Sequence, residues 1–311
     1  MNGIQRPRRS YLAKLWTYLC GHWELYLFVL PGLALGVMFK ILPVSKIIIA
    51  FKNYKPIKGI AGSAWVGLGQ FQKMFADPDV WNVIKNTLEI NLLIIVFCVP
   101  LPMLIAILLN EMNCMPLKKG IQTIIYVPHF FTWVVVYSIF FSIFSSSGIV
   151  FKLIKMLTGQ SILFFVRGSW FRFMLVLSYA WKGTGWGTIV YLAAITSIDA
   201  EIYEAARIDG ASKLQQMRYI TIPNLIPTLV LMLTIRMGSI LSGGFDQVLA
   251  FYNPSVYKAA DILGTFIYRQ GIGSANFSYA TAVGVFESLV GLMFVALSNF
   301  ASTRLTGRTV W

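Results

Sequence analysis

Charged residues are scarce in this 311-residue sequence: they make up 12% of it, whereas a soluble domain carries about a quarter. Hydrophobic residues account for 57%, and the mean hydropathy is +0.69. These values exclude a soluble globular domain and indicate a chain that has lipid as its solvent. The charge is mostly positive, with 26 Lys and Arg against 12 Asp and Glu. Because the cations are scattered between apolar runs, we expect contact with lipid headgroups rather than nucleic acid.

Histidine and cysteine are also rare, with two and three residues. Cys20, Cys98 and Cys114 have no CxxC spacing, so the sequence predicts neither a disulfide framework nor a metal site. No two carboxylates form a local motif, and His22 and His129 offer little material for a Ser-His-Asp arrangement. We therefore expect no catalytic residues, and no cofactor in this chain. The sequence also lacks a GxxxxGK[ST] loop, so any ATP that drives this protein must bind to another subunit.

Long apolar runs dominate the remaining sequence. A helix needs about 20 largely apolar residues to cross a bilayer, and six segments are long enough. The sequence therefore predicts an all-α polytopic membrane protein with six transmembrane helices. These helices are expected near Leu25–Phe51, Thr87–Asn110, Gly120–Ile143, Phe171–Ile195, Leu225–Leu241 and Ala280–Ala301.

The predicted transmembrane domain covers residues 24–303, between a polar tail (1–23) and a short C-terminal tail (304–311). The basic start is also compatible with a secretory signal peptide, but apolar sequence continues past the possible cleavage point, which favours an uncleaved first span. The predicted inner and outer segments carry equal numbers of Lys and Arg. Since the four cations ahead of the first span usually dominate orientation, we expect both termini in the cytoplasm.

One polar segment, residues 199–227, separates two strongly apolar runs in the C-terminal half. Asp199 is suited to cap a short helix, and the carboxylates that follow fall near its positive end. Ala205 and Ala206 leave one side of this helix nearly bare, and Gly210 ends it. We therefore expect a smooth-faced helix at the membrane surface that can dock against another protein.

This segment resembles the EAA loop of ABC-importer permeases. The matching words are Glu204-Ala205-Ala206, Asp209-Gly210-Ala211 and Ile220-Thr221-Ile222-Pro223. The family usually has leucine where Ile222 stands, a volume-conserving change. Shorter words are similar to the polysaccharide-permease branch that is often called LplB-like, so that the likeness covers nearly the whole chain. They are Trp65-Val66-Gly67-Leu68, Asn110-Glu111, Tyr126-Val127-Pro128-His129-Phe130, Gly185-Trp186-Gly187 and Tyr252-Asn253-Pro254.

The resemblance implies one half of a heterodimeric pore in an ABC importer of oligosaccharides, located in a bacterial cytoplasmic membrane. The implied partners are a second, homologous permease subunit, a homodimeric ATPase subunit that binds ATP and Mg, and an extracytoplasmic solute-binding protein. The loop 199–223 would be the cytoplasmic coupling helix. Glu204 has a simpler alternative role, stabilisation of the first helical turn. The implied coupling residues are Glu204, Ala205, Ala206, Asp209 and Gly210.

Two other classes of protein remain open. An ATP-independent secondary transporter of polar solutes would need internal inverted repeats and an intramembrane carboxylate for ion coupling, for which Glu89 and Glu287 are available. A membrane-embedded enzyme acting on sugars or lipids would need an acidic or metal-binding site at the membrane surface. The sequence shows no such site.

The predicted third span carries polar-tipped aromatic residues at spacings of three, four and four, which is one helical face. Such a stripe suits a path for a polar, ring-shaped solute, and it equally suits packing between helices. The four residues are Tyr126, His129, Trp133 and Tyr137.

Further pathway candidates lie in the fourth span and after the fifth. Lys182 is expected deep in the membrane, flanked by Trp181 and Trp186, whose flat faces suit stacking on sugar rings. A kinked packing site with a snorkelling lysine is the alternative. Three more candidates close the fifth span, with their polar groups on the outer side: Phe245, Asp246 and Gln247.

Two opposite charges are predicted at similar depth in neighbouring antiparallel helices. Arg236 lies about six residues inside the outer end of the fifth span, and Glu287 about seven residues inside that of the sixth. Because a buried charge needs a partner, we expect a structural ion pair between them, in preference to substrate contact.

Overall fold

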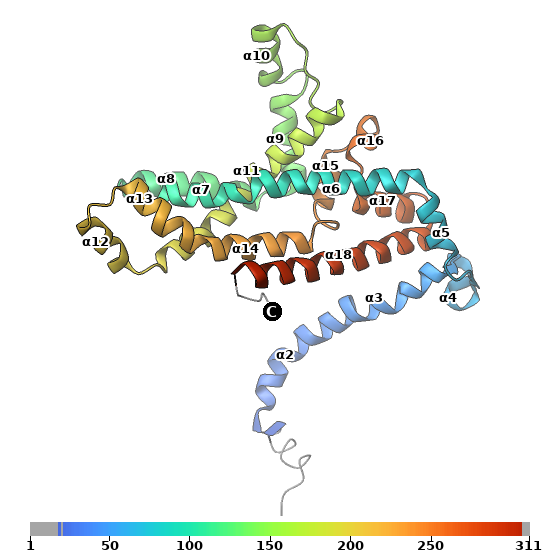
Figure 1. Ribbon diagram of the computed structural model, residues 1–311. Coiled ribbons are helices and arrows are strands. Elements are labelled where there is room, and N and C mark those ends of the chain that lie inside the picture. The colour runs from blue at the N-terminus through green and yellow to red at the C-terminus, as the bar shows by residue number, and fades with distance from the viewer. Residues whose placement is uncertain (1–17, 20, 307–311) are drawn as a thin grey trace, which may run out of the picture.

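The computed structural model describes residues 18–19 and 21–306. The expected N-terminal tail, including Cys20, and the expected C-terminal tail therefore lie largely outside the described residues. The first long element among the described residues is a helical segment that changes pitch: α2, a π-helical turn, α3 and a 3-10 segment. None of the residues of α2 is buried, and Figure 1 shows α2 running away from the other helices. The bounds are α2 (Trp23–Gly36), the π-helical turn (Val37–Ile41), α3 (Leu42–Val44) and the 3-10 segment (Ser45–Phe51).

A short polar region connects this segment to the body. Strands β1 and β2 pair antiparallel, with Lys52 opposite Trp65. Helix α6 then begins where Asp77 caps it, accepting a hydrogen bond from the backbone N–H of Asp79 at 3.0 Å. Pro78 occupies the first helical position, where its missing N–H costs nothing. The elements are β1 (Lys52–Asn53), a 3-10 turn (Pro56–Lys58), α4 (Gly59–Gly62), β2 (Ala64–Trp65), α5 (Gly69–Ala76), α6 (Pro78–Cys98) and α7 (Pro100–Asn110).

The predicted third span, Gly120–Ile143, is not one continuous helix, and this part of the prediction was wrong. Pro128 lacks an N–H, and the chain follows a 3-10 turn there before Thr132 caps a new helix by accepting from the Val135 N–H. Helices α9 and α10 consequently project from the body (Figure 1). The elements are α8 (Met115–Tyr126), the 3-10 turn (Val127–Phe130), α9 (Trp133–Phe144) and α10 (Ile149–Thr158).

Helix α11 lies at the centre of the body. Its buried residues Phe171, Met174 and Leu175 belong to one apolar cluster with residues of α6, α9 and α15. In lipid such packing is driven mainly by close van der Waals contact, and the bare faces of Gly185 and Gly187 allow it against α8 and α7. The elements are α11 (Gly168–Thr196), α12 (Ala200–Ile208), α13 (Lys213–Gln216), a π-helical turn (Met217–Thr221) and α14 (Ile222–Gly238).

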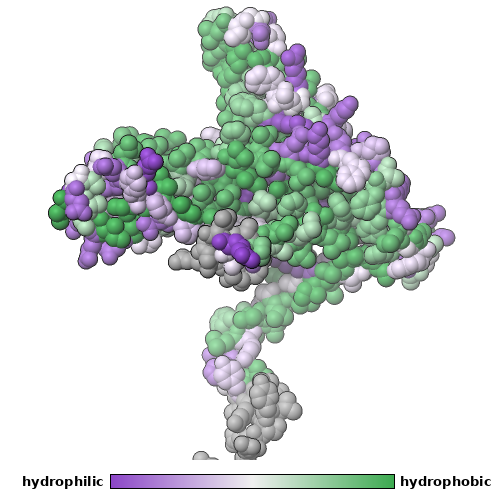
Figure 2. Space-filling view, in the orientation of Figure 1, coloured by the Kyte–Doolittle hydropathy of each residue, from purple (hydrophilic) through white to green (hydrophobic). Residues whose placement is uncertain are grey.

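Short helices lie between α14 and the last helix, and the last helix runs antiparallel to α14 along the body (Figure 1). The space-filling view shows apolar surface over the middle of the body, with hydrophilic residues gathered toward its two ends (Figure 2). The elements are α15 (Phe245–Phe251), a 3-10 turn (Pro254–Val256), α16 (Tyr257–Ala260), α17 (Leu263–Tyr268), a π-helical turn (Arg269–Gly273) and α18 (Phe277–Thr306).

Five helical segments among the described residues are long and apolar enough to cross a membrane. The predicted fourth span falls inside α11, whose 29 residues extend about 43 Å, enough for a bilayer core of about 30 Å. Arg172, Lys182 and several glycines lower its hydropathy, so six spans remain a prediction. The five segments are Trp23–Phe51, Pro78–Asn110, Trp133–Thr158, Lys213–Gly238 and Phe277–Phe300.

Candidate functional site

The EAA segment folds into a short helix, α12, at one end of the body (Figure 1). Asp199 caps it as expected, accepting a hydrogen bond from the Glu201 N–H at 3.0 Å. Gly210 follows the helix with a φ of +79°, a left-handed conformation that glycine adopts without strain. The N–H of Ala211 then donates to the Ala206 carbonyl at 2.8 Å, which closes the helix end.

The outer face of α12 and the turn after it is open to solvent. Glu204, Ala205, Asp209 and Gly210 are exposed, and Ala206 is half-buried. One apolar residue of this surface was not among the residues predicted from the sequence: Ile208, which is 87% exposed. Its signal was its position, an apolar residue between Arg207 and Asp209 within a polar loop.

Two polar contacts fasten this loop to the body. Tyr203 on α12 is half-buried, and its hydroxyl lies 2.9 Å from the Thr221 hydroxyl at the start of α14. Lys213 forms an ion pair with Glu111 at the end of α7, at 3.3 Å. Between these contacts lies a polar cavity of about 680 Å³, lined in part by Glu204. The segment from α12 to α13 is thus joined to the N-terminal end of α14 and to the C-terminal end of α7.

A break between α8 and α9 forms the second site. Lys182 on α11 donates hydrogen bonds to the carbonyl oxygens of His129 and Phe131, each at 2.6 Å. A helix interruption leaves backbone carbonyls without intrahelical partners, and the ammonium group satisfies two of them. Lys182 therefore has a structural role here, in addition to the pathway role predicted for it.

Aromatic rings surround this break. The His129 ring stacks on Trp186 with the centroids 5.1 Å apart, and Trp133 stacks on Tyr179 at 6.3 Å. The Lys182 Nζ lies 5.5 Å from the Trp133 ring centroid, within range of a cation–π interaction. The structure thus brings Lys182, His129, Trp133 and Trp186 together, although they come from two chain segments.

The expected single stripe of four aromatic residues does not exist, because the chain bends at Pro128. Tyr126 ends α8, His129 lies in the 3-10 turn, and Trp133 and Tyr137 lie on α9. Tyr137 packs against a different cluster of rings, with its centroid 5.2 Å from that of Phe251. Trp181 likewise packs against aromatic rings, those of Phe131 and Phe140.

The three candidates after the fifth span lie in different environments in the structure. Gln247 is buried and donates to the Leu175 carbonyl at 2.6 Å and to the Ser178 hydroxyl at 2.9 Å, so it does not face the outer side. Asp246 is exposed. The Phe245 ring lies 5.8 Å from that of Tyr268 and lines a pocket.

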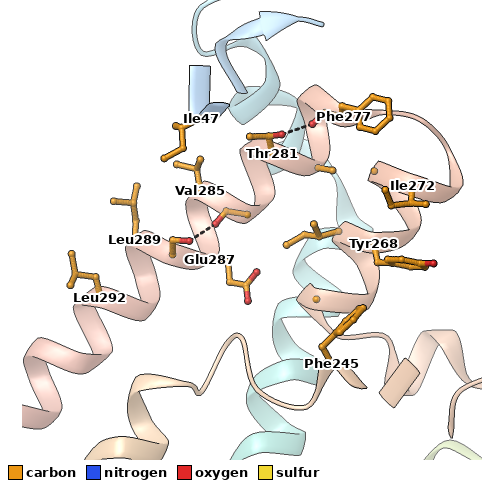
Figure 3. A pocket seen from close by; sticks show the side chains of 16 residues that line it. Ile47, Phe245, Tyr268, Ile272, Phe277, Thr281, Val285, Glu287, Leu289 and Leu292 are labelled. Carbon is orange, nitrogen blue, oxygen red and sulfur yellow. Dashed lines mark hydrogen bonds between the residues drawn. The ribbon is translucent and has the colours of Figure 1, made fainter. Parts of the chain in front are cut away.

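The predicted ion pair between Arg236 and Glu287 is not formed, and this prediction was wrong. Arg236 donates instead to the Asn91 side-chain oxygen at 2.9 Å. Glu287 lies in a pocket of about 750 Å³, with its carboxylate on the side of Phe245 and Tyr268 (Figure 3). Similar depth does not make two helical residues neighbours, because rotation about each helix axis decides which faces meet.

Comparison with known proteins identifies the family of this chain. Residues 92–309 match the family of binding-protein-dependent transport system inner membrane components. The chain belongs to this family. The permease is 43% identical to Protein LplB of Bacillus subtilis strain 168 over 281 residues, 90% of this chain and 88% of that protein.

Two further comparisons extend the likeness. The polygalacturonan/rhamnogalacturonan transport system permease protein YteP of the same organism is 42% identical over 276 residues, 88% of this chain and 86% of that protein. The crystal structure of a bacterial alginate ABC transporter, in complex with an alginate pentasaccharide-bound periplasmic protein, contains a chain that matches with a TM-score of 0.87. That match has 35% identity and covers 96% of this chain and 100% of the other. The permease therefore has the fold of an ABC type I importer subunit.

Proposed function

We propose that this permease forms one half of a heterodimeric pore in an ATP-driven importer of oligosaccharides. The observation that carries the proposal is the exposed helix α12 at a polar end of an apolar body, in a segment that contacts α14 through Tyr203 of α12 and α7 through Lys213 of α13. The likeness to YteP and to the alginate transporter, over nearly their full lengths, supports a carbohydrate as the substrate.

The proposed coupling is mechanical. A homodimeric ATPase subunit that binds ATP and Mg would receive α12 in a surface cleft, with Glu204 as the polar contact and with Ala205, Ala206 and Gly210 permitting close approach. Asp209 and Ile208 would border this contact. When the two ATPase subunits close on ATP, the helix moves with them. The Tyr203–Thr221 and Lys213–Glu111 contacts would carry that motion to α14 and α7.

The proposed topology follows from the same helix. Because an ATPase that uses cellular ATP lies in the cytoplasm, α12 would face the cytoplasm, with both termini on that side of the bacterial cytoplasmic membrane. The opposite end, with α4, α5 and the β1–β2 hairpin, would face outward (Figure 1). A solute-binding protein would deliver the oligosaccharide there, and the rings around Lys182 would line its path between the two permease subunits.

The test is ATPase activity of the complex reconstituted in lipid with its candidate ATPase, second permease and binding protein. We expect loaded binding protein to stimulate hydrolysis, and Glu204→Lys to abolish this stimulation. Glu201→Lys makes the same charge change on the same helix and is expected to retain it. If no ATPase associates with the native chain, the importer proposal fails. If both variants lose the stimulation to the same extent, the result contradicts a specific contact between Glu204 and the ATPase.

One observation favours the alternative function, a secondary transporter. Glu287 is a carboxylate in an apolar pocket of α18, and it forms no hydrogen bond or ion pair with the residues that the structure describes. Such a group suits proton coupling. Uptake driven by an imposed proton gradient without ATP, and lost in Glu287→Gln, would favour that class over the importer.

A further inference from the structure

Two cations lie within the helical body without a carboxylate partner. Lys182 lies midway along α11, and Arg236 lies in the last turn of α14. The ion pairs between described residues include neither of them. Charges at this depth are costly to insert, and those that are kept usually serve a substrate or ion pathway. Because no carboxylate among the described residues pairs with these two cations, we expect an anion from outside the chain to neutralise them.

The two cations are connected by a stack of aromatic rings. The Lys182 Nζ lies 5.5 Å from the centroid of Trp133, and Trp133 stacks on Tyr179 at 6.3 Å with an interplanar angle of 21°. The guanidinium carbon of Arg236 lies 4.8 Å from the Tyr179 centroid on α11. Three helices, α9, α11 and α14, thus build one half-buried row with a cation at each end and two flat faces between them.

Both cations keep donors that the protein does not use. The Lys182 ammonium has three N–H groups, and two of them bond to the carbonyls of His129 and Phe131. Arg236 has five; one nitrogen, Nη2, bonds to Asn91. Its Nε is buried and has no hydrogen-bond partner among the described residues. Each side chain is held in place by a neutral acceptor, and the third N–H of Lys182 and the Nη1 group of Arg236 have no hydrogen-bond acceptor among the described residues.

We propose that Lys182 and Arg236, with Trp133 and Tyr179 between them, bind the carboxylates of an acidic oligosaccharide built from hexuronate residues. The cations donate charge-assisted hydrogen bonds to the carboxylates, and the two stacked rings set the spacing between the cations. A neutral sugar has no group that matches two unpaired cations. This inference rests on the proposed function and narrows its substrate to uronate-containing chains.

The experiment measures equilibrium binding to the complete transporter in nanodiscs, without the binding protein, so that the selectivity of the binding protein does not enter. The probes are trigalacturonate and trimannuronate, each compared with its fully methyl-esterified form. We expect at least one acid to bind about tenfold or more tightly than its ester. Lys182→Met and Arg236→Met should remove this preference, whereas Lys182→Arg and Arg236→Lys should keep most of it.

A matched control separates the site from general charge. Lys155→Met removes an exposed cation of α10 and should leave the preference unchanged. Equal binding of acid and ester, binding of neither form, or an equal loss in Lys155→Met would each overturn this inference. The charge-conserving variants show whether a loss reflects misfolding, since they preserve the packing. If the preference holds while no ATPase is recruited, only the importer proposal fails; if an ATPase is recruited without the preference, only this inference fails.

Discussion

The hydroxyl of Tyr203 lies 2.9 Å from that of Thr221 and joins α12 to the residue immediately before α14. The contact links two elements whose residues are 18 positions apart in the sequence. The ring of Tyr203 is half-buried, so removal of the hydroxyl leaves its packing in place.

We therefore expect Tyr203→Phe to weaken coupling without unfolding the chain. A neutral hydrogen bond contributes about 1 kcal/mol, which corresponds to a loss of roughly fivefold in stimulated ATPase activity. The measurement is the ratio of ATPase activity with and without loaded binding protein. Tyr219→Phe, at a tyrosine that is largely exposed, is the control. An unchanged ratio in Tyr203→Phe would remove this contact from the coupling route.

The second prediction concerns Gly210 and follows from its positive φ. An L-residue with a Cβ is strained in the left-handed region by about 1–2 kcal/mol, and asparagine tolerates it better. We expect Gly210→Ala to reduce recruitment of the ATPase and Gly210→Asn to reduce it less. Co-purification of the ATPase with each variant measures this order. Equal recruitment by both variants would show that the turn adapts.

Close packing of α11 against α8 makes the third prediction. A Cβ at Gly185 would collide with the backbone carbonyl of Ile125, whereas at Gly183 it would meet only the ring of Tyr179 at ordinary contact distance. Overpacking of this kind costs about 1–3 kcal/mol. Gly185→Ala should therefore lower the melting temperature of the purified complex, and Gly183→Ala should not. Similar melting temperatures for the two variants would contradict the packing described here.

A network around Arg172 makes the fourth prediction. Its guanidinium group pairs with Glu89 at 2.6 Å, bonds to Asn86 at 2.7 Å and donates to the Ala259 carbonyl at 2.9 Å. Arg172→Met should destabilise the protein by about 2 kcal/mol, since charged hydrogen bonds contribute about 1.5–3 kcal/mol and this group is partly exposed. Thermal unfolding in detergent is the measurement.

Lys85→Met is the matched control for that network. Lys85 contacts the same carboxylate of Glu89 at 3.8 Å, but its side chain is 71% exposed. An exposed pair contributes little, so its loss should leave the melting temperature nearly unchanged. A large drop in melting temperature for Lys85→Met and none for Arg172→Met would contradict the stabilising role of the Arg172 network.

The sequence predicted the local fold of residues 199–210 well because its signals are local. A capping aspartate, two small residues and a glycine after the helix each act within a single turn, so Asp199, Ala205 and Gly210 could be interpreted without knowledge of the rest of the fold. The all-α class also followed directly from composition. The break at Pro128 had a visible signal, a proline within an apolar run, but apolar periodicity on both sides of it suggested one continuous helix.

Contacts between distant segments were harder to predict. The partners of Arg236 are a neutral amide, Asn91, and a ring, Tyr179, on two other helices. A rule that pairs opposite charges selects Glu287 and misses both of them. The two carbonyls that hold Lys182 are backbone atoms, which no side-chain pattern reveals. Such partners depend on the rotation and crossing of helices, which the sequence alone does not determine.

The first spanning segment, Trp23–Phe51, has a consequence for biosynthesis. Since no residue of α2 is buried in this chain, its insertion would require no contact with the helices made later by the ribosome. The remaining helices, from α6 onward, share the buried clusters and must assemble with one another. Membrane integration of α2 would thereby be separable from tertiary folding of the body, whereas Ser45–Phe51, at the end of the same segment, packs against α18 and joins the body only with it.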